Sequence, residues 1–168
     1  SELYYVVLHE VGHALGIGSL WNWPLEADGV FGNITDTRKL IYDGNTGDLI
    51  DIWDVDYAAV NPVYKGEKAV AAYNQIFGLT VDALPVEDSG GSGTAGGHPE
   101  EDESGRLYGT IELPGLEEEL MTGYLDAGIV NPLSIITVGM LEDLGWTVDY
   151  ALADPYNPTD GGSDGSDD

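Results

Sequence analysis

Apolar side chains return every three or four positions over residues 3–15. This spacing is typical of a helix with one apolar face, and the stripe consists of Leu3, Tyr4, Val7, Leu8, Val11 and Leu15. Gly16 and Gly18 follow the stripe. Because glycine adopts the left-handed conformation without a steric penalty, we expect the helix to end there and the chain to turn sharply.

Two further segments show signs of helix. Residues 66–77 combine good helix formers with apolar positions and are followed by Gly78, a typical helix end. A third helix is expected within residues 131–145, with Ser134 or Thr137 as its N-terminal cap and a glycine at its end.

The segments between these helices are rich in turn-forming residues. Residues 19–60 contain Trp21, Trp23 and Trp53 as expected anchors, and residues 85–105 are rich in glycine, serine and acidic residues without any period. The sequence therefore predicts a mainly α fold of the α+β class with long irregular loops. With 168 residues, 42% of them hydrophobic, the chain is long enough for one compact domain. We assign residues 1–150 to it and 151–168 to an acidic tail or linker rich in Gly, Ser and Asp.

The charge balance excludes several classes of partner. The chain has 31 acidic and five basic residues, a net charge of −26, so nucleic acid and anionic membrane surfaces would be repelled. No apolar run approaches the roughly 18 residues that a membrane span needs, so membrane insertion is not expected. The absence of cysteine excludes disulfides and thiolate metal sites.

The acidic residues allow two interpretations. Most of them fit a solvated coat suited to high salt, but hard cations such as Ca²⁺ also take clusters of carboxylates. Residues 43–48 partly resemble a calcium loop, with Asp54 at the twelfth position. Glycine and acid are exchanged in the middle of that loop relative to the EF-hand pattern, so an ordinary acidic turn is the better interpretation.

The first predicted helix carries a motif with a specific chemistry, His9-Glu10-Val11-Gly12-His13. Positions i and i+4 of a helix share a face, so both imidazoles can bind one metal ion. In the HExxH pattern the pair binds Zn²⁺, and the intervening glutamate takes the proton of a zinc-bound water as that water attacks a carbonyl. A buried helix with two hydrogen-bonded histidines is the alternative, and Glu10 between them argues against it.

A catalytic zinc site usually has three protein ligands and one open position. The position six residues after His13, where the commonest extended motif has a third histidine, is Ser19. The one other histidine is His98, which follows a glycine-rich stretch that lets the backbone approach the site closely. We therefore expect His98 to be the third ligand, with the acidic residues 100–103 as rivals, because carboxylate oxygen also binds zinc.

Several motifs together resemble the leishmanolysin-type metallopeptidases (peptidase family M8), a branch of the metzincins. They are the extended motif that ends at Gly16, a long insertion before His98, and the two runs Glu119-Leu120-Met121-Thr122-Gly123-Tyr124 and Leu141-Glu142-Asp143-Leu144-Gly145-Trp146. The resemblance covers nearly the whole chain. It implies a metzincin-like lower subdomain with an active-site helix, a Met-turn and a C-terminal helix. The N-terminal β-sheet subdomain of such enzymes is expected to be missing from this chain.

The resemblance also implies roles for particular residues. His9, His13 and His98 would bind zinc, Glu10 would be the general base, and Met121 would be the Met-turn residue beneath the metal. Tyr124 is a candidate helper in the transition state. The implied activity is that of a secreted or cell-surface endopeptidase acting on proteins or peptides. Two alternatives stay open: a non-catalytic acidic binding or cell-surface module that retains the fold, and a calcium-stabilised structural domain.

Overall fold

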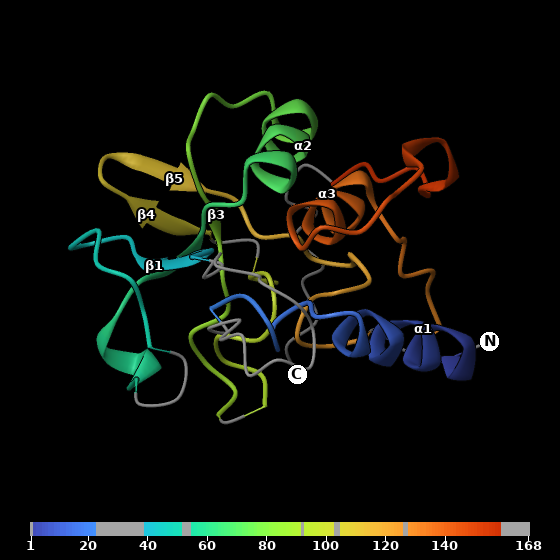
Figure 1. Cartoon of the computed structure of the whole chain (residues 1–168), viewed down its shortest axis with the longest axis horizontal. Coiled ribbons are helices and arrows are strands. Elements are labelled where there is room, and N and C mark those ends of the chain that lie inside the picture. The colour runs from blue at the N-terminus through green and yellow to red at the C-terminus, as the bar shows by residue number, and fades with distance from the viewer. Residues whose placement is uncertain are drawn as a thin grey trace, which may run out of the picture.

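The computed structural model describes residues 2–22, 39–51, 55–91, 93–102, 105–125 and 128–158. Within these ranges the chain is a mixed α+β structure, as the sequence predicts (Figure 1). Its helices are α1 (Glu2–Ala14), α2 (Glu67–Phe77) and α3 (Ile135–Asp143), with short 3₁₀ turns at Tyr57–Ala59 and Tyr150–Leu152.

The strands are short and were not placed by the sequence pattern. An antiparallel sheet has the order β1-β2-β3, and a separate hairpin pairs β4 with β5. The bounds are Ile41–Asp43 for β1, Pro62–Tyr64 for β2, Leu84–Pro85 for β3, Arg106–Tyr108 for β4 and Ile111–Leu113 for β5. Alternation over two or three residues is too short to distinguish a strand from a turn.

The helix ends lie where the sequence predicts them. Gly16 and Gly18, with φ of 115° and 72°, turn the chain after α1, and Gly78 ends α2 with φ of 66°. Ser134 is the N-cap of α3, since its side chain accepts a hydrogen bond from the amide of Ile136. These ends depend on local backbone chemistry, which explains why the sequence predicts them well.

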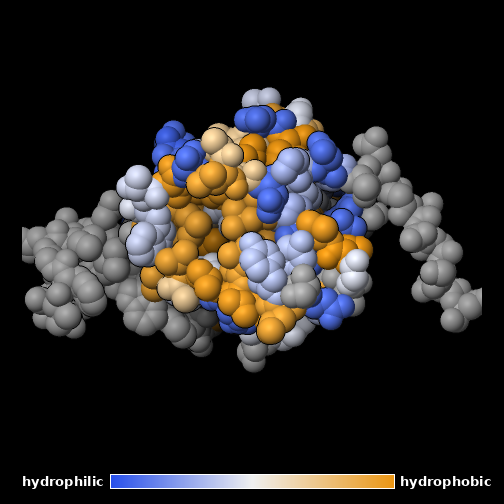
Figure 2. All heavy atoms as spheres, turned by 90° about the vertical axis from the view of Figure 1, so that its right-hand side faces the viewer, coloured by the Kyte–Doolittle hydropathy of each residue, from blue (hydrophilic) through white to orange (hydrophobic). Residues whose placement is uncertain are grey.

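Most of the apolar stripe of α1 faces outward, although Leu8 packs against the core. Leu3, Tyr4, Val7 and Val11 are between 44% and 71% exposed, whereas the buried residues of the helix are His9 and Gly12. Figure 2, which views the right-hand side of Figure 1, shows apolar surface gathered on the face where α1 begins. The apolar period predicted the helix correctly. The side of the helix that the rest of the protein covers, however, is the side that carries His9.

Helices α2 and α3 pack closely at Gly139. A Cβ atom at this position would lie 2.7 Å from the amide nitrogen of Ala69, so only glycine allows the approach. Asp143, at the end of α3, replaces the missing side-chain cap of α2. Its carboxylate accepts hydrogen bonds from the amides of Lys68 (2.9 Å) and Ala69 (3.1 Å) and from the hydroxyl of Tyr64 (3.2 Å).

Replacing Asp143 with asparagine is expected to destabilise the fold by about 1 kcal/mol, as for the loss of a helix cap. The amide keeps one acceptor oxygen but turns its NH₂ group toward a backbone donor. Urea unfolding followed by circular dichroism would measure the change. An unchanged midpoint would show that the cap from α3 contributes no stability.

Some sequence-based expectations concern the loops. Trp21 is completely buried, whereas Trp23, Trp53, Asp54 and the tail from residue 159 lie outside the described residues. The Asp43 carboxylate accepts hydrogen bonds from the amides of Asn45 and Asn61 and from the Thr46 hydroxyl, so it closes a turn. In the ranges that the structure describes, no helix combines the length and the hydrophobicity that a membrane span requires.

Candidate metal centre

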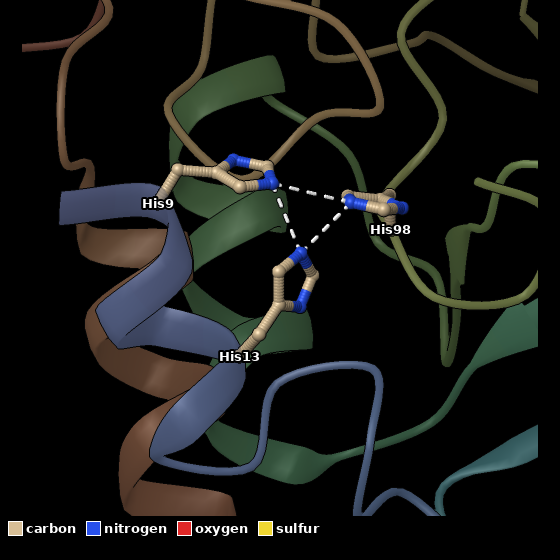
Figure 3. A group of neighbouring side chains, drawn as sticks. All are labelled: His9, His13 and His98. Carbon is tan, nitrogen blue, oxygen red and sulfur yellow. Dashed lines mark hydrogen bonds between the residues drawn. The ribbon is translucent and has the colours of Figure 1, made fainter. Parts of the chain in front are cut away.

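Three imidazoles converge at one point beside α1. His9 and His13 project from successive turns of the helix, and His98 approaches from the glycine-rich loop (Figure 3). The Nε2 atom of His13 lies 2.9 Å from the Nε2 atoms of both His9 and His98, and the remaining Nε2–Nε2 distance is 3.3 Å. Residues that are 85 positions apart in the sequence thus present the same ring atom to one site.

The other ring nitrogen of each histidine faces a backbone carbonyl. The Nδ1 atoms of His9, His13 and His98 lie 2.7, 2.9 and 2.9 Å from the carbonyl oxygens of residues 120, 17 and 94. A carbonyl oxygen can only accept, so each Nδ1 carries the proton. In the neutral ring the Nε2 atom then holds a lone pair. Three lone pairs therefore point at one another, an arrangement that a cation between them would stabilise.

The environment favours the neutral form of two of these rings, His98 and His9. Burial lowers the pKa of His98 to about 4, although the hydrogen bond to Thr94 opposes the shift. Burial also lowers the pKa of His9, while the backbone carbonyl of Leu120 and the nearby Glu10 oppose the shift. A proton on the Nε2 atom of His9 or His98 is thus disfavoured at neutral pH, which leaves the lone pairs of these two rings free for a metal ion.

The donor set fits zinc. Three imidazole nitrogens are a known ligand set for catalytic Zn²⁺, and tetrahedral Zn–N bonds of about 2.0–2.1 Å place ligand nitrogens roughly 3.3–3.4 Å apart. The observed separations of 2.9 to 3.3 Å require only small ring movements to accept the ion. Among the described residues, this group of potential ligands contains the three histidines without a carboxylate.

The loop that carries His98 is held by backbone pairing and by close contacts at glycine. The amide of Glu87 donates to the carbonyl of His98 (3.0 Å), and the amide of Gly96 donates to the carbonyl of Glu87 (2.7 Å). A Cβ atom at Gly96 would overlap the ring of Tyr57, and one at Gly18 would overlap the backbone of Gly97. The loop and the turn after α1 thus fit together because both carry glycine, as the sequence suggested for the approach to His98.

Glu10 lies on the exposed side of α1 beside His9, where it is open to solvent. Next to the histidines is a hollow of about 970 Å³. Its lining includes His13 and His98, the apolar side chains of Leu20 and Val55, and glycine backbone of the 91–97 segment. This hollow is large enough to hold several residues of a peptide chain.

Met121 lies directly against α1. It is completely buried, and a Cβ atom at Gly12 would lie 2.5 Å from its sulfur and 2.8 Å from its methyl carbon. Gly12 stands between His9 and His13 in the sequence, so this methionine supports the helix from below the histidine pair. The thioether therefore presents an apolar surface to the helix that carries His9 and His13.

The structure also places the other residues singled out in the sequence. Tyr124 is 53% exposed, its hydroxyl lies beside Gly90, and it lines a different hollow of about 790 Å³. The Ser19 hydroxyl donates to the carbonyl of His13 and so helps to end α1. Glu100, a rival ligand in the sequence, is buried and accepts a 2.6 Å hydrogen bond from Nε of Arg106.

One buried residue near the centre was not identified as a candidate from the sequence. Glu119 has no exposed surface and accepts hydrogen bonds from the Met121 amide and from residues of α3. The chain has 31 acidic residues, and its composition does not show which of them is buried and which is exposed to solvent. Its place directly before Leu120 and Met121 was the available signal.

The sequence of this chain is similar to those of known proteins. The sequence profile of the leishmanolysin family matches residues 3–157. The chain is similar to leishmanolysin of Leishmania major, with 29% identity over 152 residues, and to that of Leishmania donovani, with 27% identity over 151 residues. Each alignment covers 89% of this chain but only 19% and 20% of the relative, so the chain spans about a fifth of their length. Since the profile matches most of its residues, the chain belongs to the leishmanolysin family, peptidase family M8.

Proposed function

We propose that this chain carries the zinc centre and the general base of a metalloendopeptidase. The observation that carries the proposal is the convergence of three Nε2 lone pairs, each directed by an Nδ1–H bond to a backbone carbonyl. His9, His13 and His98 would hold the ion. When bound, zinc supplies a Lewis acid that polarises a peptide carbonyl and lowers the pKa of water.

The protein's own groups supply the remaining chemistry. Glu10 stands beside His9 with its carboxylate open to solvent, so it can take the proton of the attacking water and return it to the leaving amine. The hollow beside His13 and His98 would receive the substrate, and its apolar and glycine lining suits an extended peptide backbone. Met121 would keep the floor of the site dry, since it is completely buried under the helix.

Two parts of the proposal rest on family membership more than on contacts. Proteins and peptides are the substrates that a peptidase implies, and we expect the protein to act outside the cell or at its surface. Tyr124 is proposed as a helper in the transition state on the same ground, and its hydroxyl lies beside Gly90, in the glycine-rich segment before His98. Glu100 also lines the 790 Å³ hollow. Because it accepts a hydrogen bond from Arg106, we assign it a structural role.

Metal removal tests the proposed function. The purified chain is expected to contain one zinc ion per molecule, to hydrolyse casein, and to lose both zinc and hydrolysis on dialysis against 1,10-phenanthroline. Elemental analysis and a fluorescent casein assay would measure the two quantities, and added Zn²⁺ should restore them. Zinc binding without hydrolysis would favour a non-catalytic module, and absence of zinc would favour a structural domain.

A further inference from the structure

Glu119 is a charged residue at the centre of a fully buried network of donors. One carboxylate oxygen, Oε1, accepts from the Ser134 amide (3.0 Å), the Ser134 hydroxyl (2.6 Å) and the Thr137 hydroxyl (2.6 Å). The other oxygen, Oε2, accepts from the Met121 amide (2.7 Å). The carboxylate therefore joins the beginning of α3 to the turn that contains Met121.

The turn that contains Met121 also contacts one of the histidines, His9. The carbonyl oxygen of Leu120 accepts the Nδ1 proton of His9 at 2.7 Å, and Leu120 is the residue between Glu119 and Met121. Leu120 is also fixed by its own amide, which donates to the carbonyl of Pro132 just before α3. The position of the Leu120 carbonyl thus depends on how firmly the turn is attached to α3.

We propose that Glu119 is a positioning residue of the metal centre, which holds the Leu120 carbonyl where it fixes the tautomer and orientation of His9. The proposal deepens the proposed function and rests on it for zinc itself. Partners that orient a ligating histidine through its second ring nitrogen commonly change metal affinity by roughly 10–100-fold when they are lost. Glu119 acts one step further out, through the backbone of the residue that follows it.

The isosteric variant Glu119→Gln separates positioning from packing. Its amide oxygen can satisfy the three donors of Ser134 and Thr137, but its NH₂ group then faces the Met121 amide, donor against donor. Reversing the amide places the NH₂ group against the three donors instead. Either orientation loosens the turn while the volume of the side chain stays the same, so the core remains filled.

Asp143→Asn is the matched control. Asp143 lies on α3, the helix that Glu119 contacts, and it too accepts hydrogen bonds from backbone amides, but these amides belong to α2 and not to the turn beside His9. Any general loss of stability on neutralising a carboxylate that α3 carries or contacts should appear in both variants. An effect on His9 should appear in Glu119→Gln alone.

The experiment measures two properties of each folded variant at pH 7.5. Zinc affinity is determined by competition with a chromophoric chelator, and the tautomer of His9 in the metal-free protein is determined from imidazole ¹⁵N shifts. We expect Glu119→Gln to bind zinc roughly 10–100-fold more weakly and to show a mixed His9 tautomer. Asp143→Asn should keep the zinc affinity and the single Nδ1–H tautomer of the unmodified chain.

Wild-type zinc affinity together with an unchanged His9 tautomer in Glu119→Gln would overturn the proposal. If that variant does not fold, Thr137→Val removes one donor from the same carboxylate, and no change in either property would overturn the proposal equally. The tautomer requires no metal. If the unmodified chain binds no zinc, the proposed function fails, and the tautomer comparison still decides whether Glu119 positions His9.

Discussion

Replacing Glu10 with glutamine is expected to reduce casein hydrolysis by about 10²–10⁴-fold, the usual contribution of a general base. The amide keeps the size of the side chain but cannot take a proton from water. Zinc content should stay at the level of the unmodified chain, because Glu10 lies outside the group of three histidines and is exposed to solvent. Elemental analysis and the casein assay on the same preparation would show this separation of binding from turnover.

Glu2→Gln is a suitable control for this variant. Glu2 is an exposed acidic residue at the start of the same helix, and it lies two turns before Glu10. It should alter neither zinc content nor hydrolysis, since it removes the same charge at a distance from the histidines. Hydrolysis that persists at the wild-type rate in Glu10→Gln would contradict the proposed mechanism. A parallel loss of zinc would instead assign Glu10 to the metal site itself.

The parts of the fold that the sequence predicts are those that local chemistry determines. Helix α1 was located by its apolar period, and the other two helices by their composition and by the glycine or capping hydroxyl at their ends, such as Gly78 after α2 and Ser134 before α3. The same is true of the pair His9 and His13, whose common direction follows from one turn of helix. No knowledge of distant residues is needed for these features.

Burial and strand pairing, which depend on distant residues, were not predicted. The apolar stripe of α1 identified a helix, yet its covered side is defined by Met121, more than a hundred positions later, which packs on Gly12. Strand β2 pairs with both β1 and β3, and strands of two or three residues leave too little pattern to reveal such partners. Burial and pairing of this kind arise from tertiary contacts.

The acidic composition does not distinguish buried carboxylates from solvated ones, whereas the structure does. A net charge of −26 suggests a solvated coat, but Glu87, Glu100 and Glu119 are each at most 4% exposed. Each accepts hydrogen bonds from nearby donors: Ser89 for Glu87, Arg106 for Glu100, and Ser134 and Thr137 for Glu119. Since buried carboxylates require such donors, the position of a hydroxyl or guanidinium in space decides which acids are structural, and one sequence does not contain that information.

The position of His98 was the least local prediction about the centre, and its replacement tests the ligand set most directly. His98→Ala is expected to weaken zinc binding by more than about 100-fold, beyond the effect of losing a supporting hydrogen bond, because two imidazoles remain on α1 and an ion needs more ligands than they supply. The ring is 5% exposed, so its removal also leaves a gap beside the ion that water can enter. Competition with a chromophoric chelator would measure the affinity.

Glu100→Gln distinguishes the histidine from its carboxylate rival. Glu100 lies two residues after His98 in the same loop, but its Oε2 atom is 2.6 Å from Nε of Arg106 and its Oε1 atom accepts from the Asp102 amide. Both oxygens are thus engaged away from the three Nε2 atoms, and zinc affinity should stay unchanged in this variant as long as circular dichroism shows it folded. If Glu100→Gln lost zinc while His98→Ala kept it, the carboxylate would be the third ligand. The Nδ1–H bond from His98 to the Thr94 carbonyl argues for the opposite result, because it already aims the lone pair of His98 at His9 and His13.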